Sequence, residues 1–233
     1  MGEGKTPPLN RITVVLGHAG SGKTEFALNY SVKSRETHKK VAICDLEIIN
    51  PYFRSREQQK ELTDLGIRVI ANTFGYDISE ELPAVSAKIK IPLQNKDYIG
   101  VYDLGGDDTG SIILAQIKKE LVEEDGLLLL VVNIYRKETC DLKGIISQIN
   151  RIEEKTGLKI KGLVNNSNLL EETAMNNIIE GHNLLKEVEK ERGIPLVYDM
   201  VQDKVLSRFT KDNTENLSLF KVKLFGRPSW LSF

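Results

Sequence analysis

The sequence has few cysteines and no long apolar run. The first shortage argues against a disulfide-stabilised protein, and the second argues against a membrane-spanning helix. Its two cysteines, Cys44 and Cys140, lie far apart and form no C-x-x-C pair, so a disulfide scaffold is not indicated. The longest apolar run, 127–132, is too short to cross a bilayer and is typical of a buried strand. Residues 1–10 are polar and show no apolar core of a secretory signal. We therefore expect a cytoplasmic protein.

An excess of charge of either sign is also missing. The chain of 233 residues has 32 Lys and Arg against 33 Asp and Glu, and its net charge is −1. This balance gives the whole surface no electrostatic attraction to nucleic acid or to an acidic membrane, so we expect neither among its partners. Hydrophobic residues make up 40% of the chain and charged residues 28%, which is typical of a globular protein.

A glycine-rich octapeptide near the N-terminus is the strongest motif. It follows the short apolar run 12–16, precedes the helix-like segment 25–30, and matches G-x-x-x-x-G-K-[ST] at every specified position. This is the strand, loop and helix order of a P-loop, or Walker A motif, which binds the phosphates of a nucleoside triphosphate. The predicted phosphate-binding residues are Gly17, His18, Ala19, Gly20, Ser21, Gly22, Lys23 and Thr24.

The spacing of this motif has a chemical reason. Glycines let consecutive backbone N–H groups curl around phosphate oxygens, and the following helix presents its unpaired amides to the same anion. Lys23 is expected to reach the β- and γ-phosphates, which gives it a catalytic role as well. The hydroxyl of Thr24 is expected to bind Mg²⁺.

Strand-like and helix-like segments alternate along the rest of the chain. Strands are expected at 12–16, 41–45, 67–71, 98–103, 126–133, 159–165 and 194–198, and helices at 54–65, 109–122, 142–152 and 175–188. Such alternation predicts a three-layer α/β/α P-loop NTPase fold with a mainly parallel sheet of about seven strands. No linker interrupts the pattern, so residues 1–233 are interpreted as a single nucleotide-binding domain.

Three segments are less regular. Residues 1–10 are expected to be a flexible N-terminus, and 72–96 a loop with one short helix at 83–90. The apolar tail 214–233 is expected to pack on the body, with a final strand at 221–225. A surface patch that docks on a partner or a membrane is the alternative interpretation of that tail.

Acidic residues stand at the ends of two predicted strands, where ligands bind in open α/β sheets. Asp103 ends an apolar strand and begins a D-x-x-G turn, a pattern that predicts a Mg²⁺ ligand and a γ-phosphate sensor. Asp45 ends the second strand and Glu47 follows two positions later. Both are expected to face a metal-bound or attacking water, so Asp45 and Glu47 are candidate catalytic residues and Asp45 a candidate metal ligand.

Asn165 and Asn166 follow the sixth predicted strand and are candidate contacts of the nucleotide base, because a carboxamide can both donate and accept. An ordinary Asn-rich turn is the alternative. The sequence contains no N-K-x-D, whose Asp would select guanine, so adenine is favoured. The predicted cofactors are ATP and Mg²⁺.

These motifs resemble the ParA/MinD/Mrp/CobQ branch of P-loop ATPases, within the signal-recognition-particle/MinD/BioD superclass. The resemblance covers roughly residues 12–198 and rests on the P-loop, 45–47, 103–106 and 164–166. It implies a nucleotide-sandwich homodimer whose ATPase cycle acts on a protein partner. It also implies that Glu47 is a variant of the second acid of a D-x-D-like pair.

The sequence departs from this family at one loop position. Family members place a second lysine after the first loop glycine, where it reaches the partner's phosphates, and His18 stands there instead. Histidine is mostly neutral near neutral pH, so this position does not supply a fixed positive charge. Arg54 and Arg56 are candidates for compensation. Some relatives hold an iron–sulfur cluster with paired cysteines, but Cys140 could supply only one ligand per subunit.

Three functions remain open from the sequence. The first is a slowly hydrolysing ATPase that works as a dimeric switch on a protein partner. The second is an ATP-dependent synthetase or amide ligase, similar to dethiobiotin synthetase and the cobyrinate amidases, with a substrate pocket from 72–96. The third is a nucleotide sensor that does not hydrolyse ATP. Turnover that needs a carboxylate substrate would separate the second from the first.

Overall fold

The computed structural model describes residues 10–46, 56–71, 87–106, 108–207 and 216–225. Its strands form one parallel sheet in the order β3-β2-β4-β1-β5-β6-β7-β8. The strands are β1 Ile12–Gly17, β2 Val41–Asp45, β3 Ile67–Ala71, β4 Ile99–Gly105, β5 Leu127–Val132, β6 Gly162–Asn165, β7 Leu196–Gln202 and β8 Leu219–Val222. The predicted α/β fold class is confirmed, with one strand more than the seven expected.

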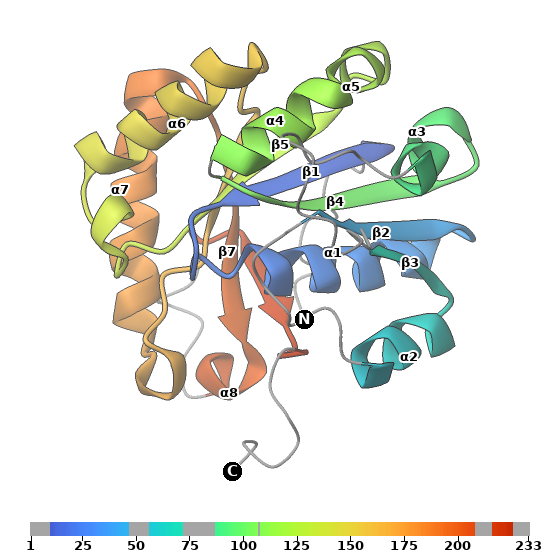
Figure 1. Cartoon of the computed structure of the whole chain (residues 1–233). Coiled ribbons are helices and arrows are strands. Elements are labelled where there is room, and N and C mark those ends of the chain that lie inside the picture. The colour runs from blue at the N-terminus through green and yellow to red at the C-terminus, as the bar shows by residue number, and fades with distance from the viewer. Residues whose placement is uncertain (1–9, 47–55, 72–86, 107, 208–215, 226–233) are drawn as a thin grey trace.

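Helices cover both faces of this sheet (Figure 1). One apolar cluster joins α1 and α2 to one face, and another joins α4, α5, α6 and α7 to the other. The α-helices are α1 Lys23–Thr37, α2 Arg56–Asp64, α3 Ile91–Gln94, α4 Asp108–Gln116, α5 Lys118–Glu123, α6 Leu142–Thr156, α7 Met175–Arg192 and α8 Asp203–Leu206. The 3₁₀ turns are η2 Ala87–Lys90, η3 Lys137–Thr139 and η4 Leu170–Glu172. None of the helices in these ranges has both the length and the apolar character needed to cross a bilayer.

Local sequence explains most element boundaries. The central strand β1 is buried along its whole length, as expected for a parallel strand covered on both faces. Helix α6 begins after Asp141, whose side chain accepts the N–H of Gly144 over 2.7 Å, and ends at Gly157 with φ +62°. Helix α7 ends in the same way at Gly193.

Several boundaries differ from the prediction. Strand β4 continues two residues beyond Asp103, which was expected to end it, and β7 lies at Leu196–Gln202 where 194–198 was expected. The helix expected at 109–122 is divided into α4 and α5 at Ile117, which is fully buried in the core. The last strand, β8, lies at Leu219–Val222 and pairs with β7, so this part of the tail extends the main sheet. The short helix expected at 83–90 is described only from residue 87, and residues 226–233 of the tail lie outside the described part.

The strand order also determines where a ligand can sit. From β1 the chain passes through α1 to β2 on one side of the sheet, whereas from β5 it passes through α6 to β6 on the other side. Strands β1 and β5 are neighbours. Connections that leave in opposite directions open a crevice at the carboxyl ends of such strands.

Candidate functional site

The P-loop connects β1 to α1 and turns sharply at two glycines. Gly20 and Gly22 have φ angles of +76° and +84°, in the left-handed region that a residue without a Cβ adopts freely. Ser21 donates its N–H to the carbonyl of His18 over 3.0 Å and closes the turn. Gly22 is the N-cap of α1 and has no side chain of its own with which to cap the helix. An anion in the loop would therefore meet the first amides of α1 and the positive end of its dipole.

Asn166, which follows β6, holds the loop from the other side. Its Nδ2 donates to the carbonyl of Ser21 over 2.7 Å. A Cβ added to Gly22 would lie only 2.0 Å from the same nitrogen. A side chain at position 22 would therefore displace the amide of Asn166 from its contact with Ser21, in addition to the strain of the positive φ angle.

The structure brings together the lysine, hydroxyl and carboxylate that the sequence singled out. Lys23 is only 4% exposed and lines a cavity beside the loop. Thr24 donates from Oγ1 to Oδ2 of Asp103 over 2.6 Å, although the two residues lie 79 positions apart. Asp103 is only 1% exposed. A buried carboxylate in contact with the start of α1 is therefore placed next to the loop 17–24.

Asp45 lies on the neighbouring strand. In the register of β2 and β4 it stands opposite Asp103, and it is buried. The N–H of Leu46 donates to the carbonyl of Asp103 over 3.0 Å, so the two strand ends are held together. Glu47, the second candidate catalytic acid, lies outside the described residues.

The oxygen atoms of Thr24, Asp103 and Asp45 are of the kind that Mg²⁺ prefers. Among the residues that the structure describes, no group of three or more His, Cys, Asp or Glu side chains is arranged to hold a metal ion. An ion here would take its other ligands from phosphate and water, as Mg²⁺ usually does. The residues present therefore fit Mg²⁺ bound together with a nucleotide.

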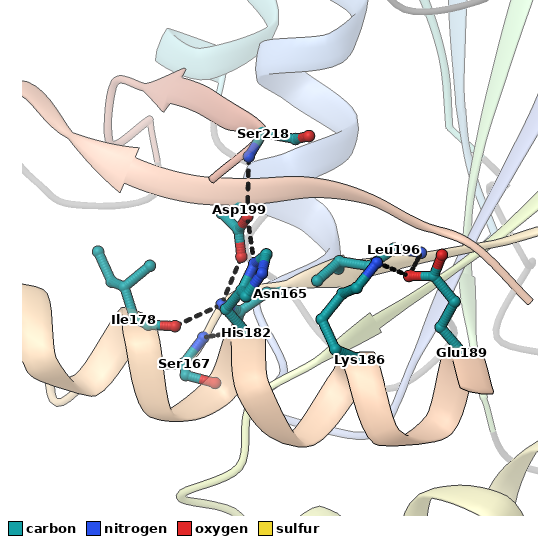
Figure 2. Close-up of polar contacts among 9 residues, drawn as sticks. All are labelled: Asn165, Ser167, Ile178, His182, Lys186, Glu189, Leu196, Asp199 and Ser218. Carbon is teal, nitrogen blue, oxygen red and sulfur yellow. Dashed lines mark hydrogen bonds and ion pairs between the residues drawn. The ribbon is translucent and has the colours of Figure 1, made fainter. Parts of the chain in front are cut away.

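The two candidate base contacts have different surroundings. Asn165 is fully buried, and its Nδ2 donates to the carbonyl of Ile178 and to Oδ1 of Asp199, both over 2.8 Å (Figure 2). Its Oδ1 accepts the N–H of Ser167. Both amide hydrogens of Asn165 are thus used within the protein, and of the two asparagines only Asn166 lines the cavity.

Asp199 in β7 organises this buried network (Figure 2). Besides the hydrogen bond from Asn165, its carboxyl group lies 2.9 Å from Nδ1 of His182 and accepts the N–H of Ser218 over 3.1 Å. These contacts join α7, β6, β7 and the start of β8. The carboxyl group of Asp199 is fully buried and has three polar partners, as buried polar groups generally do.

A cavity of about 350 Å³ extends from the P-loop along the ends of β6, β7 and β8. Its volume lies at the lower end of the range of small-molecule sites. Polar groups at one side come from Asn166, Ser167 and Asn168. The apolar part of the wall is formed by Leu28, Ile178, Met200, Val201, Val205, Val222 and Leu224. No local pattern in the sequence indicates this wall, because its residues come from the three helices α1, α7 and α8, from β7 and β8, and from the segment after β8.

Arg136 is a further residue that the sequence analysis missed. It follows β5, lines the cavity and donates from Nε to the carbonyl of Gly20 over 3.0 Å. His18, on the same loop, has Nδ1 3.7 Å from Oε2 of Glu138. Arg54 lies outside the described residues, and nothing is described of the side chain of Arg56.

The two cysteines occupy unlike places. Cys44 is buried in β2, where burial raises the pKa of its thiol and keeps it protonated. Cys140 is exposed, and its Sγ donates to the carbonyl of Lys137. Cys44 and Cys140 of one chain are therefore both free thiols and form no disulfide with each other.

Comparisons with solved structures show the fold. The cell division protein FtsY from Thermotoga maritima matches with a TM-score of 0.51 and 18% identity over 84% of this chain. The present chain spans 63% of FtsY. A nucleotide-binding protein from Archaeoglobus fulgidus in complex with ADP matches with a TM-score of 0.47 and 14% identity, covering 85% of this chain and 86% of that one. A plasmid partition protein from Borrelia burgdorferi bound to AMPPNP matches with a TM-score of 0.45 and 16% identity, covering 79% and 84%.

No family model and no curated protein matches the sequence. The likeness to FtsY nevertheless shows that the chain has the fold of a P-loop NTPase. Membership of the superclass that the sequence resembles, and of its ParA/MinD branch, stays a prediction.

Proposed function

We propose that the protein binds Mg-ATP, hydrolyses it slowly and acts as a nucleotide-dependent dimeric switch on a protein partner. The observation that carries this proposal is the loop 17–24, a backbone cradle that begins a helix, next to a buried contact between Thr24 and Asp103. A cradle with this helix dipole suits a phosphate chain.

Each residue of the site has a role in this proposal. Lys23 neutralises charge on the β- and γ-phosphates, and Thr24 and Asp103 would hold Mg²⁺, with Asp45 beside them. The bound ion would neutralise negative charge on the phosphate oxygens. Asp45 orients the attacking water, and Glu47 is proposed to assist it.

The cavity supports a nucleoside as the remainder of the ligand. Its apolar wall suits the faces of a flat base, and the carboxamides of Asn166 and Asn168 also line it. The absence of an N-K-x-D sequence favours adenine over guanine. Base contact is now proposed for Asn166 rather than for Asn165, whose amide hydrogens are already used.

The turn after Asp103 supports a switch. Gly106 donates its N–H to the carbonyl of Gly17 over 2.9 Å, and its own carbonyl accepts Nη2 of Arg151 from α6 over 3.2 Å. A γ-phosphate that recruits the N–H of Gly106 must break the contact with Gly17, so the turn and α6 would respond to the nucleotide. Dimerisation and the protein partner are proposed from the family resemblance.

Replacing Lys23 tests the site directly. K23A should weaken ATP binding by about 100-fold or more, because a buried ammonium that contacts phosphate is lost. Isothermal titration calorimetry measures the affinity, and phosphate release measures turnover. K39A is the matched control, since Lys39 is exposed beyond the other end of α1.

Unchanged affinity of K23A for ATP would contradict the proposed site. Phosphate release by the native protein that occurs only with an added carboxylate would favour the synthetase. Tight binding without any release, even with cell extract, would favour the sensor.

A further inference from the structure

Arg136 lies directly across the crevice from the P-loop. The crevice opens between the neighbouring strands β1 and β5, because their connections leave in opposite directions. The P-loop follows β1, and the turn that contains Arg136 follows β5. Two loops far apart in the sequence therefore meet at the place where the phosphates are proposed to bind.

The backbone around Arg136 is held by a compact turn. The N–H of Arg136 donates to the carbonyl of Asn133, and the N–H of Thr139 donates to the carbonyl of Arg136. The hydroxyl of Thr139 also donates to the carbonyl of Asn133 over 2.7 Å. Asn133 and Thr139 are both buried, so the side chain of Arg136 starts from a rigid point.

The guanidinium group lies against the loop itself. Its Nε donates to the carbonyl of Gly20, and a Cβ on Gly20 would be 3.0 Å from Nε and 3.1 Å from Cζ. The side chain is exposed and lines the same cavity as Lys23. Within the ranges that the structure describes, the two terminal nitrogens of Arg136 have no hydrogen-bond acceptor.

A triphosphate carries more negative charge than one lysine can neutralise. In the loop 17–24 Lys23 is the only lysine or arginine. The planar fork of arginine lets Nε keep one acceptor while the terminal nitrogens donate to another. We propose that Arg136 donates its terminal N–H groups to the β- and γ-phosphates of the nucleotide bound in the same chain, while Nε holds the carbonyl of Gly20. This inference rests on the proposed nucleotide binding and adds a phosphate contact to it.

The competing role is structural: Arg136 would only close the loop by holding Gly20. The two roles differ in which nucleotides lose affinity. We would measure AMPPNP and ADP by calorimetry and AMP by competition, with wild type, R136Q, R136K and the control K137Q. Lys137 is the exposed neighbour of Arg136, so its replacement changes the net charge equally.

R136Q should bind AMPPNP and ADP roughly 10-fold or more weakly, as expected for a lost charge-assisted hydrogen bond, and AMP within about two-fold of wild type. R136K should recover part of the loss, because it keeps the charge. K137Q should stay within about two-fold, as an exposed charge does.

Equal losses for AMP and AMPPNP in R136Q would overturn the inference in favour of the structural role. Equal losses of AMPPNP affinity in R136Q and K137Q would also overturn the inference, because they would show that only the net charge of this region matters. Unchanged AMPPNP affinity in R136Q, with normal binding by wild type, would overturn this inference alone. Failure of wild type to bind any nucleotide would overturn the proposed function and this inference together.

Discussion

At the scale of single residues, Gly22 satisfies two constraints that have different origins. Its φ of +84° comes from the local turn of the loop, which the motif predicts. Its lack of a Cβ also leaves room for Nδ2 of Asn166, which lies 145 positions from the Ser21 carbonyl that it contacts. The first constraint is local and readable from the sequence, whereas the second depends on the fold.

Replacing Gly22 with alanine should therefore cost more than the strain of a positive φ. Gly193 is a matched control, because it has φ +68° but no atom within 4 Å of an added Cβ. G193A should destabilise the protein by about 1–2 kcal/mol, the cost of a left-handed non-glycine residue. G22A should exceed this value and also lower nucleotide affinity by about 10-fold or more, since the added Cβ would displace the Asn166 amide and break its hydrogen bond to the loop carbonyl of Ser21.

Urea unfolding of both variants measures the stability, and calorimetry with AMPPNP measures the affinity. If G22A and G193A showed equal destabilisation and native affinity, the clash with Asn166 would have no role in the loop.

At the scale of elements, the break between α4 and α5 is a feature that the local sequence does not predict. Neither Gly nor Pro marks the break between α4 and α5, and the sequence predicted one helix there. The break lies at the buried Ile117, and buried Leu121 follows one turn later. In addition, Lys90 of η2 donates to Glu120 of α5 over 2.8 Å. The break between α4 and α5 therefore coincides with core packing and with the contact to η2, and not with a helix-breaking residue.

The ion pair between Lys90 and Glu120 predicts a pH-dependent contribution to stability. The hydrogen bond from Lys90 lowers the pKa of Glu120 from its usual value of 4.5. Because the folded pKa is lowered, the stabilisation is complete above about pH 4.5 and is lost as the pH falls through the folded pKa. E120Q should be less stable than wild type by about 0.5–1 kcal/mol near pH 7, and this difference should shrink on acidification below pH 4.

Denaturant unfolding across this pH range measures the difference. E123Q is the control, since Glu123 lies on the same helix but is exposed and 4.0 Å from Lys119. A difference between wild type and E120Q that did not depend on pH would show that the carboxylate charge contributes nothing.

At the scale of the whole molecule, β8 and the residues after it connect the C-terminal part of the described chain to α1, the helix that follows the P-loop. It pairs with β7 and brings Phe220 against Phe26 of α1 and Tyr198 of β7, with ring centroids 5.1 and 5.2 Å apart. The N–H of Phe225 donates to Glu25, one residue after the P-loop. The same segment supplies Val222 and Leu224 to the cavity. Residues 216–225 of the tail are therefore part of the fold, and we propose that they are also part of the nucleotide site.

Removing the aromatic ring of Phe220 tests this connection. F220A should lower the free energy of unfolding by about 3 kcal/mol, the loss typical of a buried phenylalanine. Because α1 begins at the P-loop, nucleotide affinity should fall as well. L65A is the control, since Leu65 is 44% exposed. Thermal unfolding with and without AMPPNP measures both effects, and a loss no greater than that of L65A would contradict the packing role of β8.

The sequence by itself determined the order of the elements, the P-loop motif and the positions of Asp45 in β2 and Asp103 in β4. These features depend on periodicity, turn residues and short motifs, which act over a few neighbouring positions. Tertiary structure alone decided that Asn165 is buried on Asp199, that Arg136 meets Gly20 from 116 positions away, and that the apolar wall runs from Leu28 to Leu224. Such contacts depend on strand order and on which loops share one end of the sheet, and no local pattern encodes them.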